Sequence, residues 1–138
     1  MKQVLDRLYV AGQPMPADID HARTLGIVGI INNRPAEEEP DVAGSRAAAE
    51  GLGLKKWHVP VVPGEMTLEQ VRAFQGSLAS DDGPVLAYCK SGTRTASLYA
   101  IGEVLDGLMG KDEVVLFGRT HGLDLTGAAR WLATNAAD

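Results

Sequence analysis

The chain has 138 residues, 45% of them hydrophobic and 22% charged, which suffices for one globular domain with a hydrophobic core. Its formal net charge of −5 argues against a general nucleic-acid surface, which needs a basic face. No apolar run approaches the roughly 18 residues of a membrane-spanning helix, and the N-terminus lacks the apolar region of a secretion signal. A single cysteine rules out an internal disulfide and suits a reducing compartment. We therefore expect one cytoplasmic domain over residues 1–138, with neither nucleic acid nor membrane as a partner.

The first half of the chain alternates predicted strands and helices. Leu8–Ala11 is a short apolar strand, and a helix follows over residues 16–26, with a proline at its start and a glycine at its end. Residues 27–31 form a continuous apolar run, which is typical of a strand buried on both faces. An alanine-rich helix is expected over Asp41–Glu50. The next strand, Lys55–Val61, contains a proline that places it near a sheet edge or at a strand end.

The second half continues the same alternation. Thr67 is expected to cap a helix, because Gln70 three residues later completes a capping box. Residues 84–87 form a short apolar strand. Helices are predicted after it and over Lys111–His121, and residues 125–132 should form a short helix or a pair of turns. Strands alternating with helices predict an α/β fold whose central sheet is mostly parallel and flanked by helices on both faces. The helix directly after the strand at 84–87 should bury one face, with Leu98, Ile101, Leu105 and Leu108.

The segment Tyr88–Thr95 joins a strand to a helix and contains the one cysteine. A strand–turn–helix junction directs backbone N–H groups toward one point, and the helix N-terminus adds the positive end of its dipole. An anion, or the thiolate of Cys89, would be stabilised there. Arg94 is unfavourable at a helix start unless it meets an anion, and its planar guanidinium can hold two oxygens. The pattern predicts a nucleophilic cysteine in an anion cradle, with a buried structural cysteine as the alternative.

Three loops should meet at the carboxyl edge of the predicted sheet, where ligands of parallel sheets collect. The loop after Ile31 brings Asn32, Asn33 and Arg34, the loop after Val61 brings Glu65, and the third loop is the cradle. Alternatively, Asn33 and Arg34 serve a turn, and Glu65 stabilises the following helix dipole. The three histidines have no partner at metal spacing and nothing places them near the cysteine, so surface or structural roles are expected.

Three segments, Gln13-Pro14, Ile30–Pro35 and Gly83–Arg94, resemble the phosphatase-like domain family of beta-lactamase-hydrolase-like proteins. The resemblance extends from about Leu8 to Leu132. That family is similar in fold to dual-specificity protein tyrosine phosphatases. The resemblance implies that Cys89 is the nucleophile that forms a thiophosphoryl intermediate and that Arg94 clamps the phosphate. It also implies that the hydroxyl of Thr95 hydrogen-bonds the thiolate.

The chain departs from the phosphatase pattern in two regions, the cysteine segment and the loop that should supply the general acid. Four residues rather than five separate Cys89 from Arg94, which is the length of the loop in rhodanese-type sulfurtransferases, and Tyr88 stands where those phosphatases usually have histidine. The second departure is the general acid, since no aspartate occurs in the loop at residues 61–63 and Glu65 is the nearest substitute. Without an acid, protonation of the leaving group loses about 10²–10⁴-fold in rate.

The leading functional prediction is hydrolysis of a phosphate ester through Cys89, with a small anionic or phosphorylated substrate. Neither a metal nor an organic cofactor is implied. The alternatives are sulfur transfer through a Cys89 persulfide, which needs no general acid, and a non-catalytic module that binds anions or a partner. The sequence leaves the physiological substrate and the oligomeric state open. The backbone N–H groups expected to hold the anion belong to Lys90, Ser91, Gly92, Thr93 and Arg94.

Overall fold

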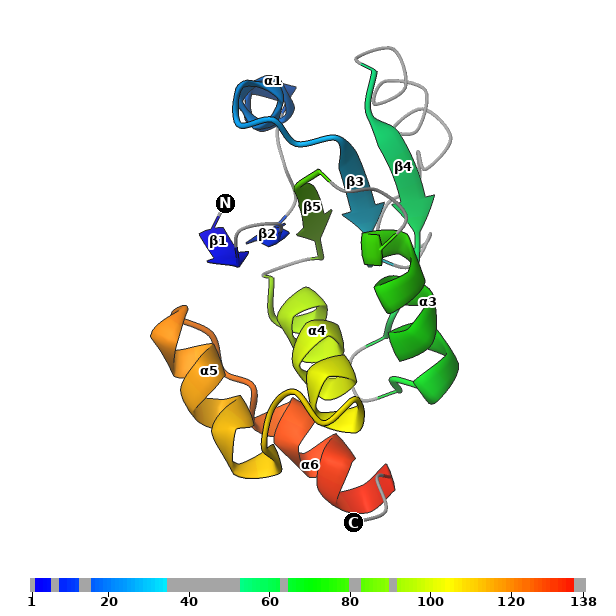
Figure 1. Cartoon of the computed structure of the whole chain (residues 1–138), viewed down its shortest axis with the longest axis vertical. Helices are drawn as coiled ribbons and strands as arrows, with labels where there is room; N and C mark the ends of the chain where they lie inside the picture. Colours follow the sequence, from blue (N-terminus) through cyan, green and yellow to red (C-terminus); the bar gives the residue numbers. More distant parts are fainter. Residues whose placement is uncertain are drawn as a thin grey trace.

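The computed structural model describes residues 2–5, 8–12, 16–34, 53–62, 65–79, 83–89 and 92–135. Figure 1 shows how the elements in these ranges follow one another. The helix expected over Asp41–Glu50 lies outside them, as do Lys90 and Ser91. The strands are β1 (Lys2–Leu5), β2 (Leu8–Ala11), β3 (Gly29–Asn32), β4 (Lys55–His58) and β5 (Val85–Tyr88). The helices are α1 (Pro16–Thr24), α3 (Leu68–Ala79), α4 (Thr93–Leu105), the 3-10 turn η1 (Lys111–Glu113), α5 (Val114–Thr120) and α6 (Thr126–Asn135).

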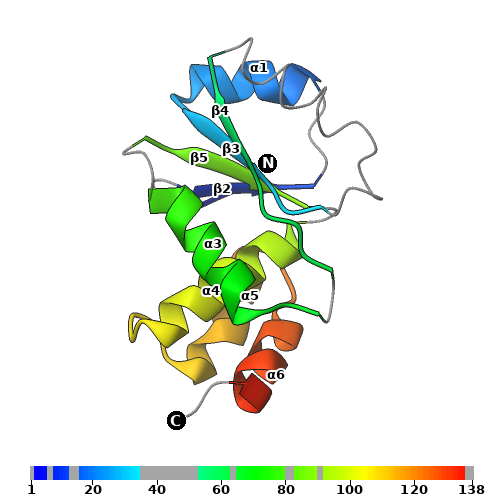
Figure 2. The same ribbon diagram turned by 90° about the vertical axis from the view of Figure 1, so that its right-hand side faces the viewer.

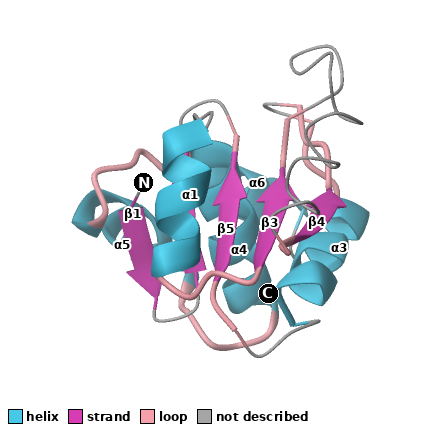
Figure 3. Ribbon diagram, turned by 90° about the horizontal axis from the view of Figure 1, so that it is seen from above, coloured by secondary structure: helices cyan, strands magenta, loops and turns pink. Residues whose placement is uncertain are grey.

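The five strands of the described chain form one sheet in the order β1-β2-β5-β3-β4. Four of them are parallel, and β1 pairs antiparallel with β2 at one edge (Figure 3). Every residue of β3 and β5 is buried, as expected for central strands that are covered on both sides. The predicted α/β fold with a mostly parallel sheet is confirmed.

Helices cover both faces of this sheet, with α1 on one side and α3, α4, α5 and α6 on the other (Figure 2). Successive side chains of a strand point to opposite faces, so β3 and β5 contribute to two separate cores. Ile30 and Leu86 pack with Ala22 of α1. Ile31 and Ala87 belong to the larger core beneath the other helices. Among the described helices, none is long and apolar enough to cross a membrane.

Several predicted boundaries are corrected by the structure. The sequence pattern does not predict β1, and β4 ends at His58 rather than Val61, because Pro60 has no N–H for the strand ladder. The α4 helix ends at Leu105, and Gly107 turns the chain with a φ of 76°. Leu108 is therefore 72% exposed instead of lying on the buried face. The helix predicted over Lys111–His121 consists of η1 followed by α5.

The register of the parallel strands brings four loops to one edge of the sheet. Asn32 lies opposite both His58 and Tyr88, and Tyr88 lies opposite Ala11. The loops after β3, β4 and β5 therefore begin side by side, as the sequence predicts. The loop after β2 joins them and is an addition to that prediction.

Candidate active site

Cys89 directly follows β5, and its side chain is completely buried. Its backbone N–H donates to the carbonyl oxygen of Ala11, at the end of β2, over 3.2 Å. The backbone N–H of Gly92 donates to Sγ of Cys89 over 3.0 Å. Gly92 has a φ of 92°, a left-handed conformation that favours glycine. The turn thus directs an amide hydrogen at the sulfur, which stabilises negative charge there.

The α4 helix starts at Thr93 with Gly92 as its N-cap, and no side chain caps this end. Its first turn has no acidic residue, so no carboxylate of that turn offsets the positive end of the helix dipole. The half-buried Arg94 donates from Nη1 to the carbonyl oxygen of Val61 over 2.9 Å. The carboxyl edge of the sheet therefore carries three features: the sulfur of Cys89, the start of α4 and the guanidinium of Arg94.

Asn33 connects three strand ends beneath this site. Its backbone N–H donates to the carbonyl oxygen of Tyr88 over 2.8 Å, and its Nδ2 donates to the carbonyl oxygen of Val59 over 2.9 Å. Its Oδ1 accepts the hydroxyl proton of Thr95 over 2.8 Å. Asn33 and Thr95 are both completely buried. The side chain of Asn33 thus fixes the start of α4 relative to the ends of β4 and β5.

This arrangement differs from the expected role of Thr95. A hydroxyl has a single proton, and that of Thr95 is donated to Asn33 rather than to the sulfur of Cys89. The expectation that Asn33 contacts an anion also changes, because its amide is engaged within the protein. In this structure both residues therefore hold the start of α4 in position.

The side chain of Tyr88 faces away from the cradle. It is buried in the core on the α1 side of the sheet, and its hydroxyl accepts a hydrogen bond from Nζ of Lys56 over 3.0 Å. The same Nζ lies 5.3 Å from the centre of the Tyr88 ring, within the range of a cation–π contact. Where the phosphatase pattern usually has histidine before the cysteine, this chain has Tyr88, which makes a core contact on the opposite face of the sheet.

The remaining predicted site residues lie around the edge of this group. Arg34 is half-buried; its N–H donates to Oδ1 of Asn32 over 2.8 Å, and its carbonyl oxygen accepts a hydrogen bond from Nε2 of His58 over 2.6 Å. The exposed Glu65 lies on the loop before α3, where its N–H donates to the carbonyl oxygen of Val62 over 3.0 Å. Thr93 is half-buried at the helix start.

Several groups with a displaced pKa lie farther along α4. Burial, followed by the charge of Glu103, raises the pKa of Tyr99 to about 12. Burial, followed by the charge of Asp106, raises the pKa of Glu103, and hydrogen bonds from Arg72 and Gln75 lower that of Asp106. In the described ranges, no group of three histidine, cysteine, aspartate or glutamate side chains is placed to hold a metal ion.

Sequence reasoning missed three contacts that build the site. They are the pairing of Cys89 with Ala11, the contact of Arg94 with the carbonyl oxygen of Val61, and the Thr95–Asn33 hydrogen bond. The first was accessible in principle, because an apolar strand at residues 8–11 can pair with the central strand. The other two depend on tertiary placement.

These features define an α/β fold of the protein tyrosine phosphatase type with a cysteine before the central helix. The family model for the phosphatase-like domain of beta-lactamase hydrolase-like protein matches residues 1–106, and the chain belongs to this family. The beta-lactamase hydrolase-like protein of Agrobacterium fabrum is 42% identical over 138 residues, covering 98% of this chain and 32% of the relative. The chain thus spans about a third of the length of that relative.

Solved structures share the fold of this chain. A candidate phosphatase from Neisseria meningitidis is 31% identical, with a TM-score of 0.83 and 96% of each chain covered. The core catalytic domain of the PP-IP phosphatase SIW14 from S. cerevisiae, in complex with citrate, shares the fold with 17% identity and a TM-score of 0.74, covering 96% of this chain and 82% of its own. TpbA of P. aeruginosa in complex with pTyr, also 17% identical, has a TM-score of 0.66, with 95% of this chain and 88% of TpbA covered.

Proposed function

We propose that the protein hydrolyses phosphate esters through Cys89. The observation that carries this proposal is the sulfur of Cys89, which accepts the N–H of Gly92 over 3.0 Å at the uncapped start of α4. A helix start without its own cap is suited to an anion, and Arg94 supplies a planar cation at the same place. The phosphotyrosine and citrate complexes of proteins with this fold support a small anionic ligand for this chain.

The proposed reaction has two steps. The Cys89 thiolate attacks phosphorus, the P–O ester bond breaks, and the leaving oxygen takes a proton from Glu65. Water then gives a proton to the Glu65 carboxylate as it attacks the thiophosphoryl intermediate, the S–P bond breaks, inorganic phosphate leaves, and the thiolate and the Glu65 acid are regenerated. Backbone N–H groups from Lys90 to Arg94 hold the phosphoryl oxygens, and Arg94 clamps two of them. Arg34 is a second cation for the substrate at the same edge.

Sulfur transfer is the second candidate, and the complete burial of the Cys89 sulfur favours it. With four residues between cysteine and arginine the cradle is tight, which suits a single sulfur atom better than a tetrahedral phosphoryl group. In this reaction the thiolate attacks the outer sulfur of thiosulfate, the S–S bond breaks and sulfite leaves. The Cys89 persulfide then gives its outer sulfur to cyanide, which yields thiocyanate, and no general acid is needed.

Parallel assays distinguish these functions. The purified protein is offered p-nitrophenyl phosphate, and separately thiosulfate with cyanide, with Cys89→Ser as the control for both. Phosphate hydrolysis that is lost in Cys89→Ser supports the first proposal, and its rate should be low because the cradle is small. Cysteine-dependent thiocyanate formation without phosphate release contradicts that proposal in favour of sulfur transfer. If neither activity occurs while phosphate still binds, the protein is a binding module.

The Glu65→Gln variant tests the proposed acid in the same assays. We expect hydrolysis of phenyl phosphate, which has a poor leaving group, to fall by up to about 10²-fold, while p-nitrophenyl phosphate is affected much less. Glu69→Gln, a matched exposed glutamate in the first turn of α3, should change neither rate. An equal loss on both esters would assign Glu65 a structural role.

A further inference from the structure

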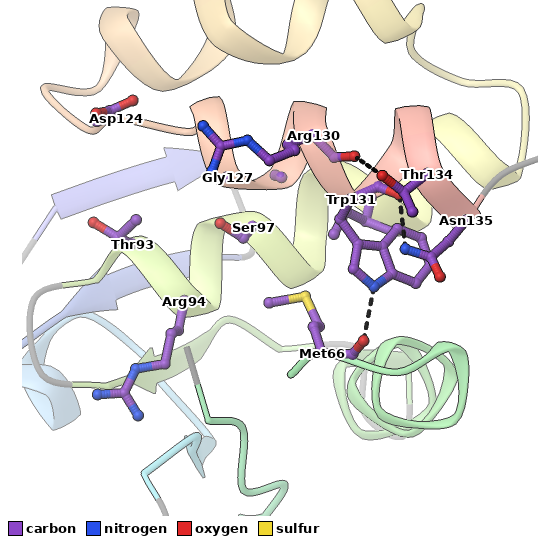
Figure 4. A pocket seen from close by; sticks show the side chains of 12 residues that line it. Met66, Thr93, Arg94, Ser97, Asp124, Gly127, Arg130, Trp131, Thr134 and Asn135 are labelled. Atoms are coloured by element: carbon purple, nitrogen blue, oxygen red, sulfur yellow. Dashed lines mark hydrogen bonds between the residues drawn. The ribbon is translucent and has the colours of Figure 1, made fainter. Parts of the chain in front are cut away.

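A cavity of about 460 Å³ lies between α4 and α6, beside the loop that leads into α3 (Figure 4). Its size falls within the range of about 300–1,000 Å³ that is usual for small-molecule sites. Its walls include Met66, Thr93, Arg94, Ser97, Ala128 and Trp131.

The cavity continues from the candidate active site. Thr93 and Arg94 form the start of α4 and also line one end of the cavity. Ser97 and Ile101 lie one and two turns farther along α4, and since residues four apart share a helix face, they extend the same wall. An anion held at the start of α4 would therefore have its organic part next to this space.

Ser97 places a hydroxyl on the α4 wall of the cavity. The residue is only 6% exposed and lines the cavity. Its hydroxyl is a polar group on a mainly apolar wall, and it can donate a hydrogen bond to a ligand or accept one from it. Figure 4 shows Ser97 on the α4 side of the cavity, between Thr93 and Met66. A ligand with a polar group would satisfy this hydroxyl.

The other walls are mainly hydrocarbon. Nε1 of Trp131 donates to the carbonyl oxygen of Met66 over 2.7 Å, so the indole N–H is already satisfied. The indole ring, the Met66 side chain and Ala128 leave apolar surface for a ligand. Charged groups lie at the rim, where Arg130 and Asp124 are both exposed.

We propose that this cavity binds the organic part of the substrate. The substrate class is a small phosphate ester whose body is largely apolar or aromatic and carries a polar group for Ser97. This inference rests on the proposed function, because it assumes that the anionic end of the same molecule occupies the cradle. It adds a specificity site along α4 to the site at Cys89.

Calorimetry with phosphonates that the enzyme cannot hydrolyse tests the cavity. The three probes are inorganic phosphate, methylphosphonate and naphthylmethylphosphonate. We expect the naphthyl probe to bind at least about tenfold more tightly than methylphosphonate, because its rings bury apolar surface. Gly127→Leu should remove most of this difference, since Gly127 lines the cavity and a Cβ there meets nothing within 4 Å. Gly76→Leu is the matched control, because it adds the same side chain in open space on α3.

The outcomes distinguish a failure of the cavity proposal from a failure of the proposed phosphate site at Cys89. Equal binding of the two phosphonates, including two affinities too weak to detect, overturns the cavity proposal. A naphthyl advantage that Gly127→Leu leaves intact also overturns it. If inorganic phosphate fails to bind while the naphthyl probe binds in a Gly127-dependent manner, the cavity binds an apolar group by itself. The phosphate site at Cys89 is then contradicted, and with it the assignment of the cavity to the organic part of a phosphate ester.

Discussion

Two strand–loop–helix junctions lie at the same edge of the sheet. They differ in whether a side chain caps the first N–H groups of the helix. At the β4–α3 junction, the hydroxyl of Thr67 accepts the N–H of Gln70 over 3.2 Å, and Oε1 of Gln70 accepts the N–H of Thr67 over 2.9 Å. This reciprocal pair is the predicted capping box. At the β5–α4 junction, Gly92 is the N-cap and offers no side chain.

The difference shows which of the two helix starts has a side-chain cap. The first turn of a helix has N–H groups without intrahelical partners, and α3 satisfies some of them with its own side chains. The start of α4 instead lies beside a buried thiol and a guanidinium. We infer that α3 is capped for stability and that α4 is left uncapped for an anion.

The largest expected effect comes from Arg94→Lys. If this variant left phosphate affinity unchanged, the start of α4 would not differ from that of α3 in the way proposed. A lysine offers a point charge instead of a planar fork, so phosphate affinity should fall by about 10- to 100-fold while the fold is retained. Isothermal calorimetry with inorganic phosphate measures this loss. Arg72→Lys, an exposed arginine of α3 that pairs with Asp106 over 2.8 Å, is the control and should leave affinity unchanged. Unchanged affinity in Arg94→Lys would mean that Arg94 is not the clamp.

A smaller effect is expected for Thr95→Val. This variant tests whether the hydrogen bond from Thr95 to Asn33 stabilises the start of α4, which has no side-chain cap. The variant keeps the shape of the side chain but leaves the buried Oδ1 of Asn33 without its donor. We expect a loss of about 1–3 kcal/mol in the free energy of unfolding, measured by urea denaturation. Thr95→Ser keeps the hydroxyl and should lose much less. Equal losses in both variants would assign the effect to packing of the methyl group.

Local signals in the sequence account for much of the fold. Apolar runs of strand length predict β2, β3 and β5, and the pair of Thr67 and Gln70 predicts the start of α3. β1 escapes prediction because the run Lys2–Leu5 is short and partly polar, so its strand state depends on pairing with β2. Leu108 fits a helical face in sequence, but the turn at Gly107 removes it from that face.

In the candidate site, too, some features are predicted by the local sequence and others depend on the tertiary structure. The spacing of Cys89, Gly92 and Arg94 is local and indicates an anion cradle from sequence alone. The partner of Thr95 is 62 residues away in the sequence, and a hydroxyl can donate its single proton to only one acceptor. Sequence therefore predicts which residues gather at the sheet edge, whereas the choice of hydrogen-bond partner requires the tertiary structure.

The smallest expected effect belongs to Thr67→Ala at the capped junction. Removing a helix cap costs about 1 kcal/mol, so the free energy of unfolding should fall by that amount in urea denaturation. Phosphate affinity should stay unchanged, because the capping box satisfies groups of α3 and not a ligand. Gln70→Ala is the companion variant, since it removes the other half of the box and also the contact from Nε2 of Gln70 to the carbonyl oxygen of Pro60.

Comparing the two single variants then tests whether the two junctions are independent. Pro60 and Val61 are adjacent in the chain, and Arg94 donates to the carbonyl oxygen of Val61, so a shift of this loop could reach the guanidinium. If phosphate affinity falls in Gln70→Ala but not in Thr67→Ala, the Pro60 contact positions the clamp. If both variants weaken phosphate binding as strongly as Arg94→Lys, the capped junction is part of the anion site and the contrast between the two helix starts is wrong.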